Sequence, residues 1–569
     1  MRTTPVCRSV GLLAHFREEQ IEPENAMPPS APADHELRLL LVDEQRSFHI
    51  MMKAMLFNVG ISRIHYAYSA DEARRLCLRD TFDVFLIDYD LGAGENGRQL
   101  LESLREKKLI PPHGVVMVVS GDASRAMVLS ALELEPDEYL MKPFSQEQFK
   151  TRLRRALERK RNLLALFQAL DRGDDATLLE ECESGATQHP KYSNFCRCLQ
   201  ADTLIKLKRA QEARSLMRQL LAAQDNSWAR QALGRACFDL GLFDEAISHL
   251  QACLRLTPLM VEAYHWLAES YLAQGRDDDA QAQLQQAVAI SPQSVHLSRR
   301  LAEVSLKRGD YAVAKDVLLS LIDLTRNSIH RTPHYLGAYI QTLTLYALNS
   351  NDSYHIANLQ KQVNNALSRL RDVMVGSDFN YPAFEQLCQA RVQIARGELL
   401  KGKKMLYRAN QNWLDAPENM PPTLLGETIL GLYQLGEFEY ADSLQGLLSD
   451  NEDQLLTTCI QVTRTDKTVL ERRQCYQQLN ELGIKAYQAG ELEQALGHFR
   501  EALRRAPANT GAALNKIQVL LQLIGKSHKN KDYDDECRTT ISLLDGIPLN
   551  PAQNERYRKL RDEFTQLRH

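Results

Sequence analysis

Residues 84–88 read Val-Phe-Leu-Ile-Asp, a short apolar run that ends on a carboxylate. Similar runs lie at Leu37–Val42, Val115–Val119 and Tyr139–Met141, with a weaker one at Arg63–Ala67. Short runs rich in Val, Ile and Leu are typical of strands buried on both faces of a parallel sheet. Amphipathic stretches separate them, at Ser47–Val59, Ala70–Leu78, Asn96–Glu106, Arg125–Leu132 and from Ser145 onward. This alternation predicts a doubly wound α/β domain.

Polar residues follow the strands of this predicted sheet. Asp43 and Glu44 follow the first run, Asp88 ends the third, Ser120 follows the fourth, and Lys142 follows the fifth. Ligands of such folds bind at the carboxyl ends of the strands, so these side chains should meet at one edge. Three adjacent carboxylates repel unless a cation lies among them, and their oxygens suit Mg²⁺. A lysine nearby can stabilise a transferred phosphoryl group, which favours an aspartate nucleophile that forms an aspartyl phosphate.

Residues from Leu37 to Leu157 resemble the receiver domain of bacterial two-component response regulators, which has a flavodoxin-like fold. The resemblance rests on the segments VDE (42–44), DVFLID (83–88), VVSG (118–121) and YLMKPF (139–144), in family order. It implies that a histidine kinase or phosphotransfer protein phosphorylates Asp88, with Ser120 and Lys142 contacting the phosphoryl group. It also implies that Tyr139 is the aromatic switch residue and that the Lys142–Pro143 peptide is cis.

The same resemblance implies a Mg²⁺ site made by Asp43, Glu44, Asp88 and the backbone carbonyl of Asp90. Two departures bear on it. Glu44 stands where the family more often has a second aspartate, so the metal site can be reshaped. The segment DYDLGAGENG (88–97) lacks the family's usual proline and is one residue longer, with three glycines that add flexibility. A degenerate receiver that works without phosphate is therefore the alternative.

After Leu157 the sequence changes to a repeat with a period of 34 residues. Glycines recur at 241, 275 and 309, alanines at 246, 280 and 314, and prolines at 258 and 292. The pattern resembles the tetratricopeptide repeat (TPR), in which small residues let paired helices approach closely. It predicts an all-α TPR solenoid over residues 163–569, with clear repeats at about 227–326 and 476–509. We expect residues 145–170 to form one continuous helix shared by the two domains.

Composition narrows the functional classes. The 569 residues carry a net charge of −4 with no strongly basic domain, which argues against nucleic acid as a partner. No apolar stretch is long enough for a membrane span, and the scattered cysteines are typical of a reduced, cytoplasmic protein. Residues 1–36 include a proline-rich stretch and are expected to be a disordered leader.

The combined hypothesis is a phosphorylation-controlled signalling protein that is not an enzyme beyond its own phosphoryl transfer and dephosphorylation. The receiver would accept phosphate on Asp88, and the TPR array would bind a protein partner whose identity the sequence does not supply. Two alternatives stay open: a TPR-assisted phosphatase of another phospho-signalling protein, and a phosphate-independent scaffold. The oligomeric state and the pathway also stay open.

Overall fold

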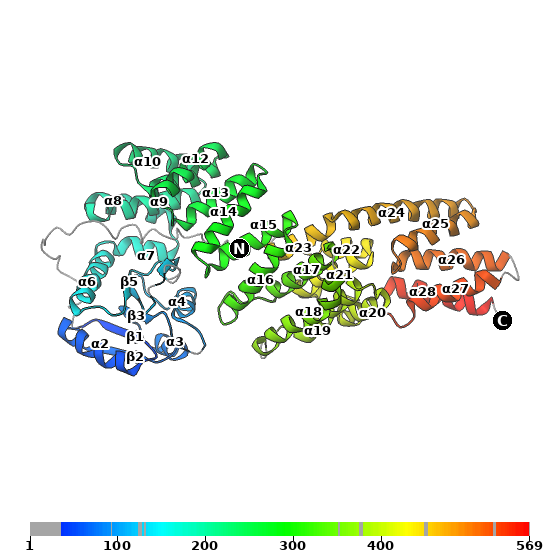
Figure 1. The fold of residues 1–569 in the computed structure, drawn as a ribbon, viewed down its shortest axis with the longest axis horizontal. Coiled ribbons are helices and arrows are strands. Elements are labelled where there is room, and N and C mark those ends of the chain that lie inside the picture. Colours follow the sequence, from blue (N-terminus) through cyan, green and yellow to red (C-terminus); the bar gives the residue numbers. More distant parts are fainter. Residues whose placement is uncertain are drawn as a thin grey trace. The chain divides into compact units, whose positions relative to one another are not determined.

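The structure is a computed structural model that describes residues 36–92, 94–122, 124, 128–129, 133–350, 353–374, 379–448, 453–526 and 531–567. The expected leader therefore lies almost entirely outside the described residues. The chain divides into two compact units (Figure 1). The first comprises Met1–Val304 with Asn327–Arg331, and the second comprises Ser305–Arg326 with Thr332–His569.

The first unit begins with a five-stranded parallel sheet in the order β2-β1-β3-β4-β5. The strands are β1 (Arg38–Val42), β2 (Arg63–Ala67), β3 (Val84–Asp88), β4 (Val115–Ser120) and β5 (Glu138–Met141). The predicted doubly wound α/β fold is thus confirmed, including the weaker second strand. The strand order changes direction between β1 and β3, and folds of this kind bind their ligands at such a point, at the carboxyl ends of the strands.

Helices surround the sheet (Figure 1), and a hydrophobic core lies on each of its faces, as the strand composition requires. Helices α2 (Arg46–Val59) and α6 (Gln146–Asn162) pack on the face that carries Leu39, Leu41 and Leu86. Helices α3 (Ala70–Arg79) and α4 (Gly97–Glu106) pack on the face that carries Leu40, Val42 and Ile87. The helix expected at 125–132 falls largely outside the described residues. Burial on both faces explains why these strands are apolar throughout.

Capping boxes set the starts of α4 and α6. Asn96 and Gln99 exchange side-chain to backbone hydrogen bonds of 2.9 and 3.0 Å at the start of α4. Ser145 and Gln148 do the same at the start of α6, with distances of 3.1 and 2.9 Å. Each box satisfies amide groups that a helix otherwise leaves without partners.

The prediction of one continuous helix over residues 145–170 is wrong in one respect, because the helix is interrupted at Leu163. Helix α6 ends at Asn162 and α7 begins at Leu164, while Leu163 has φ −112° and ψ 25°. The Leu163 side chain is buried with Leu166, Leu178 and Cys182 in the core of the first helical hairpin. Hairpin packing redirects the chain at this residue, and neither Pro nor Gly marks the break in the sequence.

Every described element after β5 is helical, as predicted. The first unit contains α7 (Leu164–Arg172), α8 (Asp175–Gln188), the 3₁₀ helix η3 (Pro190–Tyr192), α9 (Ser193–Lys206), α10 (Ala210–Ala223), α11 (Ser227–Asp239), α12 (Phe243–Leu256), α13 (Val261–Ala273), α14 (Asp277–Ile290) and most of α15 (Val295–Arg308). Successive helices pack in pairs, α7 on α8, α11 on α12 and α13 on α14. This is the arrangement of helical hairpins that the 34-residue period predicts.

The second unit continues the helical array. It contains α16 (Tyr311–Thr325), α17 (Pro333–Asn349), α18 (Ser353–Met374), α19 (Tyr381–Ala395), α20 (Leu399–Ala409), η4 (Gln411–Trp413), η5 (Pro417–Asn419), α21 (Pro422–Leu435), α22 (Phe438–Gln445), α23 (Gln454–Thr465), α24 (Lys467–Gln488), α25 (Leu492–Arg505), α26 (Thr510–Lys526), α27 (Lys531–Leu544) and α28 (Pro551–Gln566). The tightest pairs are α19 with α20 and α24 with α25. Residues 476–509, predicted as a clear repeat, lie on the second of these pairs.

The repeating glycines have a role that differs from the one expected. Gly275 ends its helix with φ +71°, and a Cβ atom placed there would meet no atom within 4 Å. Its requirement is therefore a left-handed turn rather than close packing. Close approach occurs at Gly234 instead, where a Cβ would lie 2.6 Å from Leu250 Cγ. Gly275 therefore makes a turn and Gly234 makes a close helix contact, whereas the sequence analysis gave small residues the second role alone.

Replacing Gly275 with alanine should destabilise its unit by about 1 kcal/mol, because an L-residue is strained in the left-handed region. The same change at Gly497, an exposed glycine inside α25 with open space around it, should be neutral or stabilising by up to about 1 kcal/mol. Denaturant unfolding of both variants measures the difference. Equal effects of the two substitutions would contradict a conformational role for Gly275.

Candidate functional site

Three carboxylates meet at the point where the strand order changes direction. Asp43 directly follows β1, and Asp88 is the last residue of the neighbouring strand β3. One oxygen each from Asp43, Glu44 and Asp88 lie within 4.8 Å of one another. Asp43 and Asp88 are buried, whereas Glu44 is partly exposed at the rim. The sheet therefore brings together the acidic residues that the sequence predicted.

Lys142 binds two of these carboxylates. Its Nζ atom lies 2.7 Å from Asp43 Oδ2 and 2.7 Å from Asp88 Oδ2. The ammonium group also lies 3.9 Å from the centre of the Phe48 ring, so an aromatic face packs against the cation. Burial lowers the pKa of Lys142, but the two carboxylates outweigh burial and raise it overall. Lys142 is therefore a fixed positive charge beside Asp88.

The electrostatic environment of Asp88 favours the binding of a further cation. Burial raises the pKa of Asp88 to about 7, Lys142 opposes this rise, and Asp43 adds to it. One lysine is thus not enough to balance the buried acids. The oxygens Glu44 Oε2 and Asp88 Oδ1 are buried and accept no hydrogen bond from the protein. Oxygen atoms without donors in an acidic cluster fit a hard cation such as Mg²⁺.

Ser120 and Tyr139 lie beside the cluster on β4 and β5. Ser120 is buried, and its Oγ accepts a hydrogen bond of 3.1 Å from the Asp122 amide. Tyr139 is 4 % exposed, and its hydroxyl donates to the Asp122 carbonyl over 3.4 Å. Both side chains therefore hydrogen-bond the backbone of Asp122, which lies shortly after β4. Their roles in phosphoryl binding and switching stay predictions.

Asp90 lies outside the carboxylate cluster. Its side chain is exposed and accepts a 3.0 Å hydrogen bond from the Gly92 amide, so only its backbone carbonyl stays a predicted metal ligand. The Lys142–Pro143 peptide is cis, as the resemblance implied. Gly97, at the start of α4, packs so closely on the Asp88 backbone carbonyl that a Cβ atom would collide with it. Its amide also donates to the Tyr89 carbonyl over 2.8 Å.

Sequence reasoning missed the residues that support the site from behind. His49, which is buried in α2, lies with Nε2 2.8 Å from the Asp43 carbonyl oxygen. Its ring stacks on Tyr66 and Tyr68 from the neighbouring strand region. Phe48 and Gly97 contact Lys142 and Asp88 as described. His49, Phe48 and Gly97 do not stand at strand ends, which was the only signal used, so helix phase and packing were needed to find them.

Comparisons with known proteins agree with this geometry. Residues 39–154 match the family model of the response regulator receiver domain. Residues 198–261, 232–295, 267–329 and 480–535 match the tetratricopeptide repeat. The chain carries a response regulator receiver domain followed by a tetratricopeptide repeat array. The regions left between these matches include most of the second unit up to α24.

The proteins that are similar to this chain match it over the receiver domain. The transcriptional regulatory protein CpxR of Escherichia coli K12 is 33% identical over 122 residues, which are 21% of this chain and 50% of that protein. The regulatory protein AlgB of Pseudomonas putida is 30% identical over 138 residues, 24% of this chain and 30% of that protein. The chain thus spans at most about half the length of these relatives. A solved CheY-like receiver domain from Methanospirillum hungatei is 24% identical, with a TM-score of 0.20, and covers 22% of this chain and 96% of its own.

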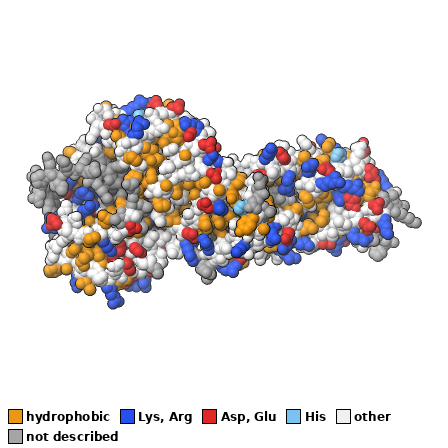
Figure 2. All heavy atoms as spheres, viewed as in Figure 1, with side chains coloured by type: hydrophobic (Ala, Val, Ile, Leu, Met, Phe, Trp, Pro, Cys, Tyr) orange, Lys and Arg blue, Asp and Glu red, His pale blue; other side chains and the backbone are white. Residues whose placement is uncertain are grey.

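The surface and the helices carry two further observations. Figure 2 shows basic and acidic side chains interspersed over the visible face of each unit, consistent with the small net charge. Among the helices that the structure describes, none combines the length and apolar character that a bilayer crossing requires.

The raised pKa of Asp88 predicts that the stability of the folded receiver depends on pH. The usual pKa of an aspartate is 3.8, so the folded receiver binds a proton that the unfolded chain releases between about pH 4 and 7. Stability without metal should fall as the pH rises through this window. Asp88→Asn should therefore stabilise the metal-free protein by about 2 kcal/mol more at pH 8 than at pH 5. Thermal unfolding at both pH values measures this, and equal effects would contradict it.

Added Mg²⁺ should stabilise the receiver by neutralising the carboxylates. At a hundredfold excess over its dissociation constant, the stabilisation is about 2.7 kcal/mol. Asp43→Asn should remove most of it, whereas Asp71→Asn, on the exposed side of α3, should keep it. Thermal melts with and without Mg²⁺ measure the effect. If all three proteins respond alike, the cluster is not the metal site.

Proposed function

We propose that this chain is a phosphorylation-controlled binding protein, in which Asp88 accepts a phosphoryl group and the repeat array binds a protein partner. The single observation that carries the first half is the pairing of Lys142 with both Asp43 and Asp88 at 2.7 Å. This pairing holds the Lys142 ammonium group beside Asp88, whose second oxygen, Oδ1, accepts no hydrogen bond from the protein. A receiver domain also implies a phosphodonor such as a histidine kinase or phosphotransfer protein.

The chemistry follows from the positions of these side chains. An Asp88 oxygen attacks the phosphorus of the donor, a P–O bond to Asp88 forms, and the bond to the leaving group breaks with its electron pair. Lys142, which neutralises Asp88 before the reaction, pairs with the phosphoryl oxygens after it. Ser120 Oγ can donate a hydrogen bond to the same oxygens. Asp43, Glu44 and Asp88 would hold Mg²⁺, which would neutralise charge on the anionic donor.

The second half of the proposal rests on the helical array. Stacked hairpins bury their apolar faces against one another and offer long, exposed helix faces, an architecture that suits protein binding. Fold alone does not assign function, so the site supports the receiver half more strongly than the array half. We propose that the output is partner binding rather than catalysis, and that phosphorylation of Asp88 controls it.

Phosphoryl transfer to Asp88 is tested by incubating the full chain with acetyl phosphate and Mg²⁺. Intact-mass spectrometry should show one added phosphoryl group on the wild type and on Asp71→Asn. Asp88→Asn should show none, because the nucleophile is gone. Lys142→Ala should slow labelling by about 10²-fold or more, since the charge that stabilises the transferring group is lost. Undiminished labelling of Asp88→Asn would falsify the assignment.

A further inference from the structure

Three helices toward the C-terminal end of the second unit share a row of polar side chains. Helix α26 contacts both α24 and α28 (Figure 1). Asn515 of α26 donates from Nδ2 to Asn480 Oδ1 of α24 over 3.0 Å. The Oδ1 atom of the same Asn515 accepts a 2.8 Å hydrogen bond from Arg556 Nη2 of α28. One asparagine therefore connects the three helices.

Two glutamines of α26 extend this row. Gln518 Nε2 donates to the Tyr487 hydroxyl of α24 over 3.0 Å, and Gln518 Oε1 accepts a 2.7 Å hydrogen bond from Arg556. Gln522 Nε2 also donates to the Tyr487 hydroxyl, over 2.6 Å. Gln522 is exposed and the other residues of the row are partly exposed, so a partner can reach them. We call these six residues the polar strip: Asn480, Tyr487, Asn515, Gln518, Gln522 and Arg556.

The sequence places these residues on one face of each helix. On α24, Asn480, Ile484 and Tyr487 stand at positions i, i+4 and i+7, and the three strip residues of α26 stand at i, i+3 and i+7. Such positions share one face of a helix. Ile484, between the two polar residues of α24, is 38 % exposed. A partner on this face can therefore bury apolar surface as well as form hydrogen bonds.

Arg556 is the one charged residue of the polar strip, and it has no acidic partner among the described residues. Its Nη2 atom donates to amide oxygens. Burial lowers the pKa of Arg556, and Tyr487 opposes this effect. On α28, Glu555 pairs with Lys559 at 2.6 Å, and Glu563 stands two helical turns beyond Arg556. Helix α26 contains no acidic residue. A partly buried charge without a counter-ion favours the binding of an anion.

The hydrogen bonds within the strip leave donors unused. In the part of the chain that the structure describes, no acceptor binds Arg556 Nη1, Asn480 Nδ2 or the hydroxyl hydrogen of Tyr487. An ionised carboxylate is an acceptor only, and it forms short, charge-assisted hydrogen bonds with a guanidinium group. The unused donors and the charge of Arg556 therefore fit the same ligand group.

A single positive charge suits a carboxylate better than a phosphate. The lysine of α26 that neighbours the strip, Lys516, is paired with Glu536 at 2.8 Å and adds no free charge. A phosphate monoester carries almost two negative charges at neutral pH, whereas a carboxylate carries one. Arg556 can balance the charge of a carboxylate but only about half of the charge of a phosphate.

The dimensions of the strip favour an extended peptide. Packed helices lie about 8–10 Å apart, so the strip extends roughly 20 Å from α24 to α28. An extended chain covers this length with about six residues. The side-chain amides of Asn480 and Gln522 can hydrogen-bond a peptide backbone, which carries both donors and acceptors.

We propose that the polar strip binds an extended acidic segment of a partner protein, with an Asp or Glu side chain of that segment paired to Arg556. This inference rests on the proposed function and deepens its array half. The carboxylate accepts hydrogen bonds from Arg556 Nη1, while Nη2 keeps its bonds to Asn515 and Gln518, which fix the orientation of the guanidinium group. The amides of α24 and α26 bind the backbone of the segment, and Ile484 contacts its apolar side chains.

The test uses random peptides as probes for the full chain. Phage-displayed peptides of about twelve residues, about twice the length that covers the strip, are selected on the immobilised wild type. The binders are synthesised with an acetylated N-terminus and an amidated C-terminus, so that every carboxylate belongs to a side chain. Fluorescence anisotropy measures their dissociation constants. We expect binders that carry an Asp or Glu at a shared position, and changing that acid to its amide should weaken binding about tenfold, or about 1.4 kcal/mol.

Two variants of the strip are compared with a matched control. Arg556→Gln should weaken binding of the acidic peptides about tenfold, and the amide change in the peptide should then add little, because both changes remove the same interaction. Asn480→Asp places a carboxylate in the strip and should weaken the same peptides while Arg556 stays in place. Arg558→Gln is the control, because Arg558 is exposed and lies about 200° around α28 from Arg556. It should bind like the wild type, and circular dichroism checks that each variant is folded.

The possible results separate this inference from the proposed function. If a folded strip variant binds the peptides like the wild type, or if Arg558→Gln weakens them equally, the polar strip is not the site, while peptide binding still supports the array half of the proposed function. If the binders tolerate the amide change, or bind only with a free C-terminal carboxylate, the occupant is not an internal acidic segment. If no peptide binds the wild type, the array half fails together with this inference, and labelling of Asp88 still decides the receiver half.

Discussion

The pairing of Lys142 with Asp43 and Asp88 is the interaction on which the receiver site depends. Three carboxylates at one sheet edge repel one another, and a single ammonium group reduces this repulsion without cancelling it. The consequence is visible in the raised pKa of Asp88. An incompletely neutralised acidic cluster attracts a cation and has an oxygen left for reaction, which is why the geometry suits phosphoryl transfer rather than only structural ion pairing.

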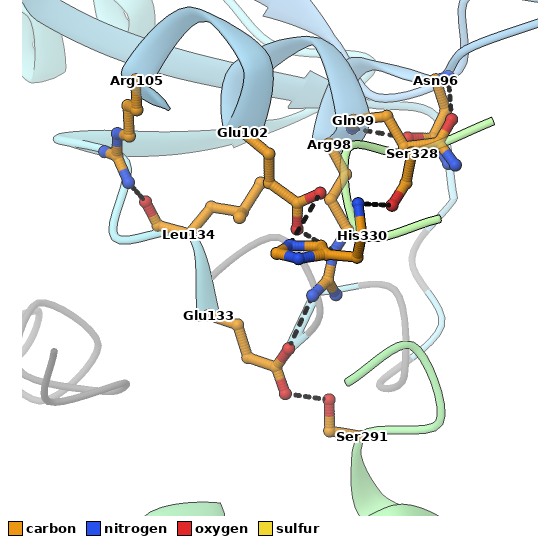
Figure 3. A network of polar contacts seen from close by, with 10 residues as sticks. All are labelled: Asn96, Arg98, Gln99, Glu102, Arg105, Glu133, Leu134, Ser291, Ser328 and His330. Atoms are coloured by element: carbon orange, nitrogen blue, oxygen red, sulfur yellow. Dashed lines mark hydrogen bonds and ion pairs between the residues drawn. The ribbon is translucent and has the colours of Figure 1, made fainter. Parts of the chain in front are cut away.

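The same principle of shared charge recurs at the receiver–array contact. Glu133 pairs with Arg98 at 3.1 Å and accepts a hydrogen bond from the hydroxyl of Ser291 (Figure 3). The helix expected to join the two domains is interrupted, since α6 ends at Asn162 and α7 begins at Leu164.

Much of the fold could be predicted because its signals are local. Apolar runs at Val84–Ile87 and Val115–Val119 are strands, and the 34-residue spacing of Gly241 and Gly275 marks helical hairpins. Residues at strand ends, such as Asp88 and Lys142, could be assigned to one site because a parallel sheet places those ends at one edge. Positions whose role depends on packing were missed or misread. Leu163 breaks a helix only because the first hairpin buries it.

The sequence by itself determined the fold class, the hairpin repeat and the set of acidic and basic residues at the receiver site, because periodicity and strand order are properties of the chain. Only the tertiary structure decided which partners those residues have. His49 under Asp43, Gly97 against Asp88, and Ser291 on Glu133 join residues from separate elements, and Ser291 is separated from Glu133 by more than 150 residues. Such contacts depend on how helices pack against a sheet and on where a repeat turn meets the receiver, which no local pattern encodes.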